Sequence, residues 1–68
     1  MSFAEWFKQQ RTKKRLSQTE TAHQLKLSSP TISRWEDGTE PRAKHLARIC
    51  KWAPIKADKL LGLLDNGA

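Results

Sequence analysis

Cysteine, tyrosine, glycine and long apolar runs are all scarce or absent in this 68-residue chain. The single cysteine, Cys50, excludes an internal disulfide and a cysteine-rich zinc site, and it favours a reducing compartment. The opening residues, MSFAEWFKQQ, carry Glu5 and no apolar run, so we expect neither a signal peptide nor a membrane span. His23 and His45 lie far apart without ligand-spaced partners. We therefore predict no metal site and no cofactor.

Acidic residues are also few, because 7 Asp and Glu oppose 13 Lys and Arg, for a formal net charge of +6. Such an excess on a small body attracts polyanions. The partner could be nucleic acid, an anionic membrane or an acidic protein, and the charge could also serve solubility alone. A chain of 68 residues predicts one domain, residues 1–68, that is too small for a large internal active-site cavity. No catalytic serine or cysteine set and no glycine-rich phosphate loop is present, so we do not expect an enzyme.

Helical periodicity recurs along the whole chain and predicts an all-α domain of five short helices. Ser2, Ser17 and Ser28 are the expected N-caps of the first three helices, and Glu5 and Glu20 are placed to complete two capping boxes. The expected helices cover residues 3–14, 18–25, 29–37, 42–52 and 56–64, with residues 65–68 frayed. The expected inward side chains are Phe3, Phe7, Ala22, Leu25, Ile32, Trp35, Leu46, Ala47, Ile49, Cys50, Leu60, Leu61 and Leu64, with Trp6 semi-buried.

Residues 17–38 place two short helices around a tight turn in a basic domain, which is typical of a helix-turn-helix motif. In that motif the second helix lies in the major groove of DNA. Its outward face carries the residues that we expect to read bases: Ser29, Pro30, Ser33 and Arg34. Arg34 could donate bidentately to a guanine and Pro30 could pack on thymine methyl groups, whereas the serines discriminate weakly.

The segment LSQTETAHQLKLSSPTISRWEDGTEP resembles the helix-turn-helix of the Cro and repressor proteins of lambda-like phages and of their Xre-type bacterial relatives. The resemblance extends over residues 3–64 and implies a compact, five-helix, lambda-repressor-like domain. It also implies phosphate contacts from Ser17, Gln18, Ser28, Thr39, Arg42 and Lys44. Thr21, Asp37 and Trp52 depart from the usual family pattern.

The same resemblance implies a structural ion pair between Arg11 and Glu36. It further implies that two copies bind a near-palindromic operator in double-stranded DNA as a homodimer, because one recognition helix reads too few base pairs. These 68 residues leave no room for a separate oligomerisation domain, so the dimer contact is expected after the fourth helix. The residues expected there are Ile55, Lys56, Ala57 and Lys59.

The function that the resemblance implies is sequence-specific transcription regulation in the cytoplasm of a bacterial host, with a Cro-like phage repressor as the first choice. Antitoxins, restriction–modification controllers and autoregulators use the same scaffold and stay open as alternatives. A helical module for protein binding is another alternative, and exposed Trp6 and Trp52 would favour it. A membrane-surface peptide fits poorly, because the apolar residues are spread over several capped helices.

Overall fold

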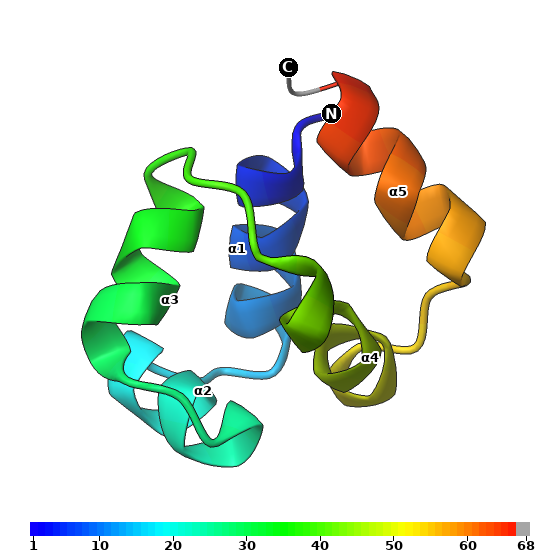
Figure 1. Ribbon diagram of the computed structural model, residues 1–68. Coiled ribbons are helices and arrows are strands. Elements are labelled where there is room, and N and C mark those ends of the chain that lie inside the picture. The colour runs from blue at the N-terminus through cyan, green and yellow to red at the C-terminus, as the bar shows by residue number, and fades with distance from the viewer. Residues whose placement is uncertain (67–68) are drawn as a thin grey trace.

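The computed structural model describes residues 1–66, and the side chains of residues 1–64. The regular structure in these residues is entirely helical, which confirms the all-α prediction. Figure 1 shows α1 in the middle of the molecule, with α2 and α3 on one side of it and α4 and α5 on the other. The elements are α1 (Phe3–Lys13), α2 (Gln18–Leu25), α3 (Ser29–Glu36), α4 (Ala43–Trp52) and α5 (Ala57–Asn66).

Capping boxes begin α1 and α2, as predicted. The Ser2 hydroxyl accepts the Glu5 backbone N–H at 3.2 Å, and the Glu5 carboxylate accepts the Ser2 N–H at 3.4 Å. The equivalent distances between Ser17 and Glu20 are 3.0 and 2.9 Å. Hydrogen bonds from the capping serines lower the pKa of both carboxyl groups. The start of each helix is therefore fixed by local side chains as well as by packing.

The chain leaves α1, α2 and α3 through the same type of turn. In each, a residue with left-handed backbone donates its N–H to the carbonyl three residues earlier, and the next residue donates to the carbonyl five residues earlier. This is the Schellman motif, which normally places glycine at the left-handed position. Gly38 fills it after α3 with φ 116°, but Arg15 and Lys26 fill it after α1 and α2 with φ 58° and 59°. Arg15 and Lys26 therefore adopt a backbone conformation that is sterically unfavourable for any residue with a Cβ atom.

The core contains a cluster of aromatic rings and joins all five helices. The Phe7 ring lies edge-on to Trp35 with centroids 5.4 Å apart, and it lies 5.0 Å from the Trp52 ring. Trp6 is half-buried, as predicted, with its ring 5.9 Å from that of Phe3. The buried cluster comprises Phe3, Phe7, Ala22, Leu25, Ile32, Trp35, Ile49 and Leu60.

The fraying expected for residues 65–68 stays a prediction: the α5 helix continues to Asn66, and residues 67–68 lie outside the described part. Three local predictions differ from the structure. Arg42 is the N-cap of α4 and not its first helical residue. Ala47 and Leu61 were expected on inner faces but are exposed. Each lies one residue beyond a buried or half-buried neighbour, and one residue turns a helix by about 100°.

Thr21 occupies the place at which the family pattern has a larger aliphatic residue. Its side chain is fully buried, and its hydroxyl oxygen has no hydrogen-bond partner among residues 1–64. A buried hydroxyl without a partner destabilises a fold.

Candidate nucleic-acid interface

The two helices of the motif pack directly against each other, and α3 also packs against α1. The turn between α2 and α3 comprises residues 26–28. Lys26 supplies the left-handed backbone, and Leu27 donates its N–H to the Ala22 carbonyl at 2.8 Å. Leu27 is half-buried against the core, so it anchors the turn from inside. The turn therefore fixes the direction in which α3 leaves the body of the molecule.

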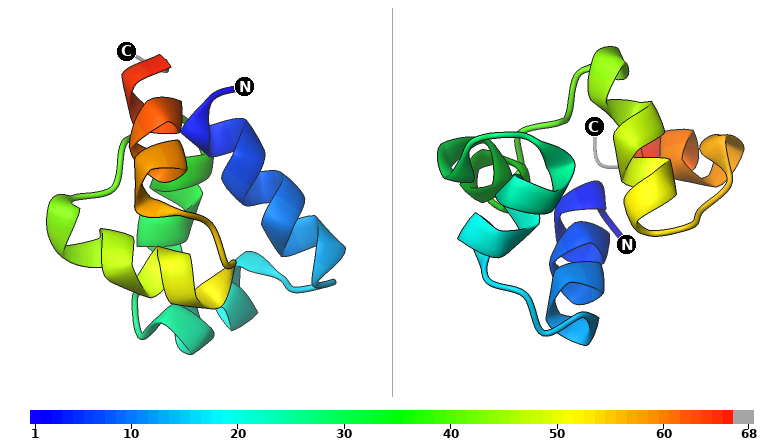
Figure 2. Two further views of the ribbon diagram at one scale, coloured as in Figure 1. Left: turned by 90° about the vertical axis from the view of Figure 1, so that its right-hand side faces the viewer. Right: turned by 90° about the horizontal axis from the view of Figure 1, so that it is seen from below.

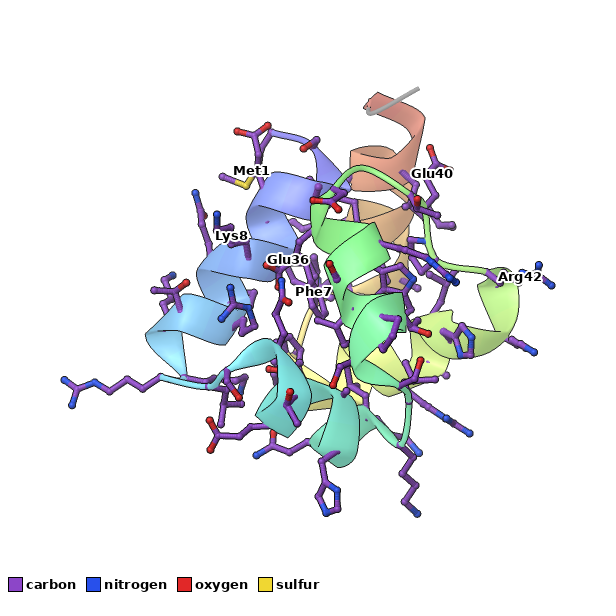
Figure 3. All side chains as sticks on the ribbon, turned by 90° about the vertical axis from the view of Figure 1, so that its left-hand side faces the viewer. Met1, Phe7, Lys8, Glu36, Glu40 and Arg42 are labelled. Atoms are coloured by element: carbon purple, nitrogen blue, oxygen red, sulfur yellow. The ribbon has the colours of Figure 1, made fainter. Side chains whose placement is uncertain are left out.

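An ion pair ties the end of α3 to α1. The Arg11 guanidinium donates through Nε to Glu36 Oε2 at 2.6 Å and through Nη2 to Oε1 at 3.0 Å. The Glu36 side chain is only 5% exposed, and the bond to it raises the pKa of Arg11. Figure 3 shows Glu36 pointing inward between α3 and α1. A bidentate, partly buried pair of this kind fixes orientation as well as distance.

The same carboxylate connects to the start of α2. Gln18 donates through Nε2 to Glu36 Oε1 at 3.3 Å, and Arg11 also donates through Nη1 to the Leu16 carbonyl at 2.8 Å. One guanidinium and one carboxylate thus join α1, the following loop, α2 and α3. Gln18, expected at a phosphate, is therefore already positioned by this network.

The first turn of α3 differs from those of α1 and α2, because no side chain caps it. The Ser28 hydroxyl instead lies 2.8 Å from the Thr31 hydroxyl. The sequence-based expectation that Ser28 is the N-cap holds for its backbone but not for its side chain. The local reason is that Thr31, three residues on, offers a competing hydroxyl.

The four residues expected to read bases are not equally accessible. Pro30 and Arg34 are exposed, whereas Ser29 and Ser33 are half-buried. The Ser29 hydroxyl donates to the Thr19 hydroxyl of α2 at 3.1 Å. Ser29 therefore supports the contact between the two motif helices, and its hydroxyl hydrogen is committed to that contact.

A basic hollow lies beside α3, where the following loop enters α4. Its volume is about 230 Å³. It brings Arg34 of α3 together with Thr39, Arg42 and Lys44, which the sequence separates by up to ten residues. Figure 3 shows Arg42 extending from the body of the molecule. Thr31, Trp35, Glu40 and His45 complete the lining.

Sequence reasoning gave no role to Thr31 and considered His45 only as a possible metal ligand. The His45 ring lies 5.8 Å from the Trp35 ring, and its Nδ1 is buried without a partner among the described side chains. Burial lowers the pKa of His45, and the nearby cations Lys44, Arg48 and Arg42 lower it further. Both effects favour the neutral form of His45. The only sequence signal for this position was a histidine that follows a proline and lies among basic residues.

The expected dimer residues lie beyond the C-terminal end of α4, in the loop into α5 and at the start of α5. Lys56, Ala57 and Lys59 are exposed, and Ile55 is half-buried. A shallow hollow of about 360 Å³ there is lined by Cys50, Pro54, Ile55 and Lys56. This surface is small and mixed in polarity.

Within the described residues, no three histidine, cysteine or acidic side chains gather as a potential metal site. No helix within these residues has the length and hydropathy needed to span a membrane.

Comparison with known proteins gives one family and one informative relative. The family model described as "Helix-turn-helix" matches residues 7–51. The chain is 40% identical over 62 residues to the HTH-type transcriptional activator BcrR of Enterococcus faecalis. The alignment covers 90% of this chain but only 30% of that protein. No solved structure matches the chain significantly.

Proposed function

Because this chain belongs to the Xre-type helix-turn-helix family of DNA-binding transcription regulators, we propose that α3 reads the major groove of a double-stranded operator. In this proposal Arg34 is the main base-reading residue. It is exposed on α3, and a guanidinium can donate two parallel hydrogen bonds to guanine O6 and N7. Pro30 supplies an apolar contact one turn earlier, and Ser29 and Ser33 line the same face.

The observation that carries the proposal is the basic hollow beside α3. A base-reading helix needs cations at the groove edge, where the phosphates lie. Arg42, Lys44 and Thr39 line the same hollow as Arg34, which supports the proposal. In the proposed complex, Ser17, Gln18 and Ser28 meet the phosphates at the other edge. The Arg11–Glu36 pair then fixes α3 relative to α1 and α2, so that the residues on both sides of α3 keep a constant spacing.

Two copies on a near-palindromic operator would place their α3 helices one DNA turn, about 34–36 Å, apart. The surface around Ile55, Lys56, Ala57 and Lys59 is the proposed contact between the copies. It is small, so we expect weak association in solution and cooperative binding on DNA.

Two regulatory outcomes are compatible with operator binding. Our first choice is a Cro-like repressor that blocks promoter access by occupying DNA. The second candidate is activation, which the 40% identity to a protein named a transcriptional activator favours. This chain spans only 30% of that relative's length, so residues outside the matched part could set its regulatory outcome. A reporter gene driven by a promoter that contains the bound site separates them: a repressor lowers expression and an activator raises it.

A protein-binding module without DNA specificity receives little support. Trp6 and Trp52 are half-buried and packed against the core, whereas that function favours exposed tryptophans. Antitoxins and restriction–modification controllers also bind operators, so the proposal of DNA reading applies equally to them.

Hydroxyl-radical footprinting on a genomic fragment enriched by the protein tests the proposal. The expected pattern is two protected half-sites about one helical turn apart on one face of the DNA. Uniform protection along the fragment, without half-sites, would contradict operator reading.

A further inference from the structure

A second basic hollow lies between the end of α2 and the C-terminal half of α4, with a volume of about 390 Å³. Three of its lining residues are cations, and none of them is acidic. The lining residues are Gln24, Leu25, Lys26, Arg48, Lys51 and Trp52. The hollow therefore concentrates positive charge around a partly apolar floor.

Side-chain contacts hold this hollow in shape. Arg48 donates through Nη1 to the Leu25 carbonyl at 3.2 Å, at the end of α2. Trp52 donates through Nε1 to the Gln24 amide oxygen at 3.0 Å. The Lys14 ammonium lies over the Trp52 ring, 5.3 Å from its centre, and this cation–π contact also holds the ring. Arg48 and Trp52 are thus fixed by α2, while Lys26 and Lys51 are exposed and free to meet a ligand.

The hollow differs in its lining from the proposed DNA-reading surface, although Arg48 also lies near His45 of the first hollow. None of its lining residues belongs to the base-reading or phosphate-binding sets. Lys44 lines the first hollow, whereas Lys51 lies seven residues further along α4, a rise of about 10 Å. Figure 2 shows α4 passing across the molecule from the loop after α3 to the loop before α5.

We propose that this hollow binds an acidic peptide segment of a protein partner. Carboxylates of the segment pair with Lys26 and Lys51, and an apolar side chain between them packs against the half-buried Trp52. The lining favours a peptide over a DNA backbone, because a phosphodiester chain offers no apolar group for the floor. The inference goes beyond operator reading and does not depend on it, because the hollow belongs to the chain alone and its test uses no DNA.

The test is a nuclear magnetic resonance titration of the isotope-labelled chain, without DNA, at about 150 mM salt. The probe is a short synthetic peptide that alternates Asp and Glu with Leu and Phe. We expect shifts at Gln24–Lys26, at Arg48–Trp52 and at the Trp52 indole N–H. A peptide with Asn and Gln in place of the acids should cause none of them.

A double variant with matched controls makes the test specific. Lys26→Gln with Lys51→Gln should weaken peptide binding about tenfold, since two exposed ion pairs are lost. Lys8→Gln with Lys13→Gln removes the same charge from the outer face of α1 and should change binding much less. Circular dichroism establishes that both variants are folded.

Three results would overturn the proposal. The first is no binding of the acidic peptide. The second is equal weakening by the two double variants, because attraction would then follow net charge alone. The third is movement of the same resonances by a random-sequence duplex and not by the peptide, which would make the hollow a DNA contact.

Discussion

At the residue scale, Arg34 and Arg42 line one hollow but are expected to act differently. Arg34→Ala should cost about 1–3 kcal/mol at the preferred site and relax base preference at one or two positions. Arg42→Ala should weaken all duplexes alike and reduce the slope of log affinity against log salt by about one unit. Fluorescence anisotropy with matched and mismatched duplexes at several salt concentrations measures both effects. An unchanged slope for Arg42→Ala would remove it from the phosphate contacts.

The left-handed backbone at Lys26 gives a prediction about stability. Lys26→Gly should raise the free energy of unfolding by about 0.5–1 kcal/mol, because glycine adopts this conformation without steric strain. Gly38→Ala is the opposite control. A Cβ at Gly38 would meet no atom within 4 Å, so its strained φ of 116° alone should destabilise the fold. Urea denaturation of the two variants measures both changes, and a less stable Lys26→Gly variant would contradict the prediction.

His45 gives a prediction about pH. Its pKa is lowered in the folded chain, so below the ordinary histidine value of about 6.5 the unfolded chain binds a proton that the folded chain resists. Stability should therefore be complete above that value and fall as pH decreases toward the lowered folded pKa. Denaturation at pH values between about 5.5 and 7.5 should show this slope in the natural chain.

His45→Gln should flatten the slope, and His23→Gln, at an exposed position, is the matched control. The chosen range stays above the region where Glu5 and Glu20, whose pKa values are also lowered, take up protons. Equal slopes in the natural chain and the His45→Gln variant would contradict the assignment.

At the scale of the elements, the Arg11–Glu36 pair is the main polar connection between α1 and α3. Glu36→Gln leaves a partly buried guanidinium without its anion and should cost about 3 kcal/mol. A domain of this size has only about 3–10 kcal/mol of stability, so part of the population would unfold. Glu40→Gln, at an exposed loop position, should change the free energy of unfolding by less than about 0.5 kcal/mol.

Replacing both members of the pair with apolar residues separates the cost of an unpaired charge from the contribution of the pair itself. Arg11→Met with Glu36→Leu should recover much of the stability lost in Glu36→Gln, because no charge is left unpaired. Thermal denaturation followed by circular dichroism compares these variants. A Glu36→Gln variant as stable as the natural chain would show that the pair contributes little.

The helices and their caps were predictable because they depend on local sequence. The α2 bounds match the prediction, and the boxes at Ser2 and Ser17 formed as expected. The left-handed turns at Arg15 and Lys26 were not predictable, since residue preferences place glycine there. The two hollows could not be predicted either. They depend on how far α4 lies from α2 and α3, and on the long-range contacts of Arg48 and His45.

At the scale of the whole molecule, the net charge of +6 draws the chain toward any polyanion, so binding to DNA is weak support for operator reading. Sequence preference is the stronger criterion, because it depends on α3 and not on total charge. The central claim is that the outer face of α3 reads bases through Arg34.

The most direct test is selection of bound duplexes from a random library at about 150 mM salt, carried out with the natural chain and with Arg34→Ala. The account predicts an enriched inverted repeat with two chains bound, and loss of preference at one or two positions of each half-site in the variant. No enriched sequence, or the same sequence with undiminished preference from Arg34→Ala, would contradict it.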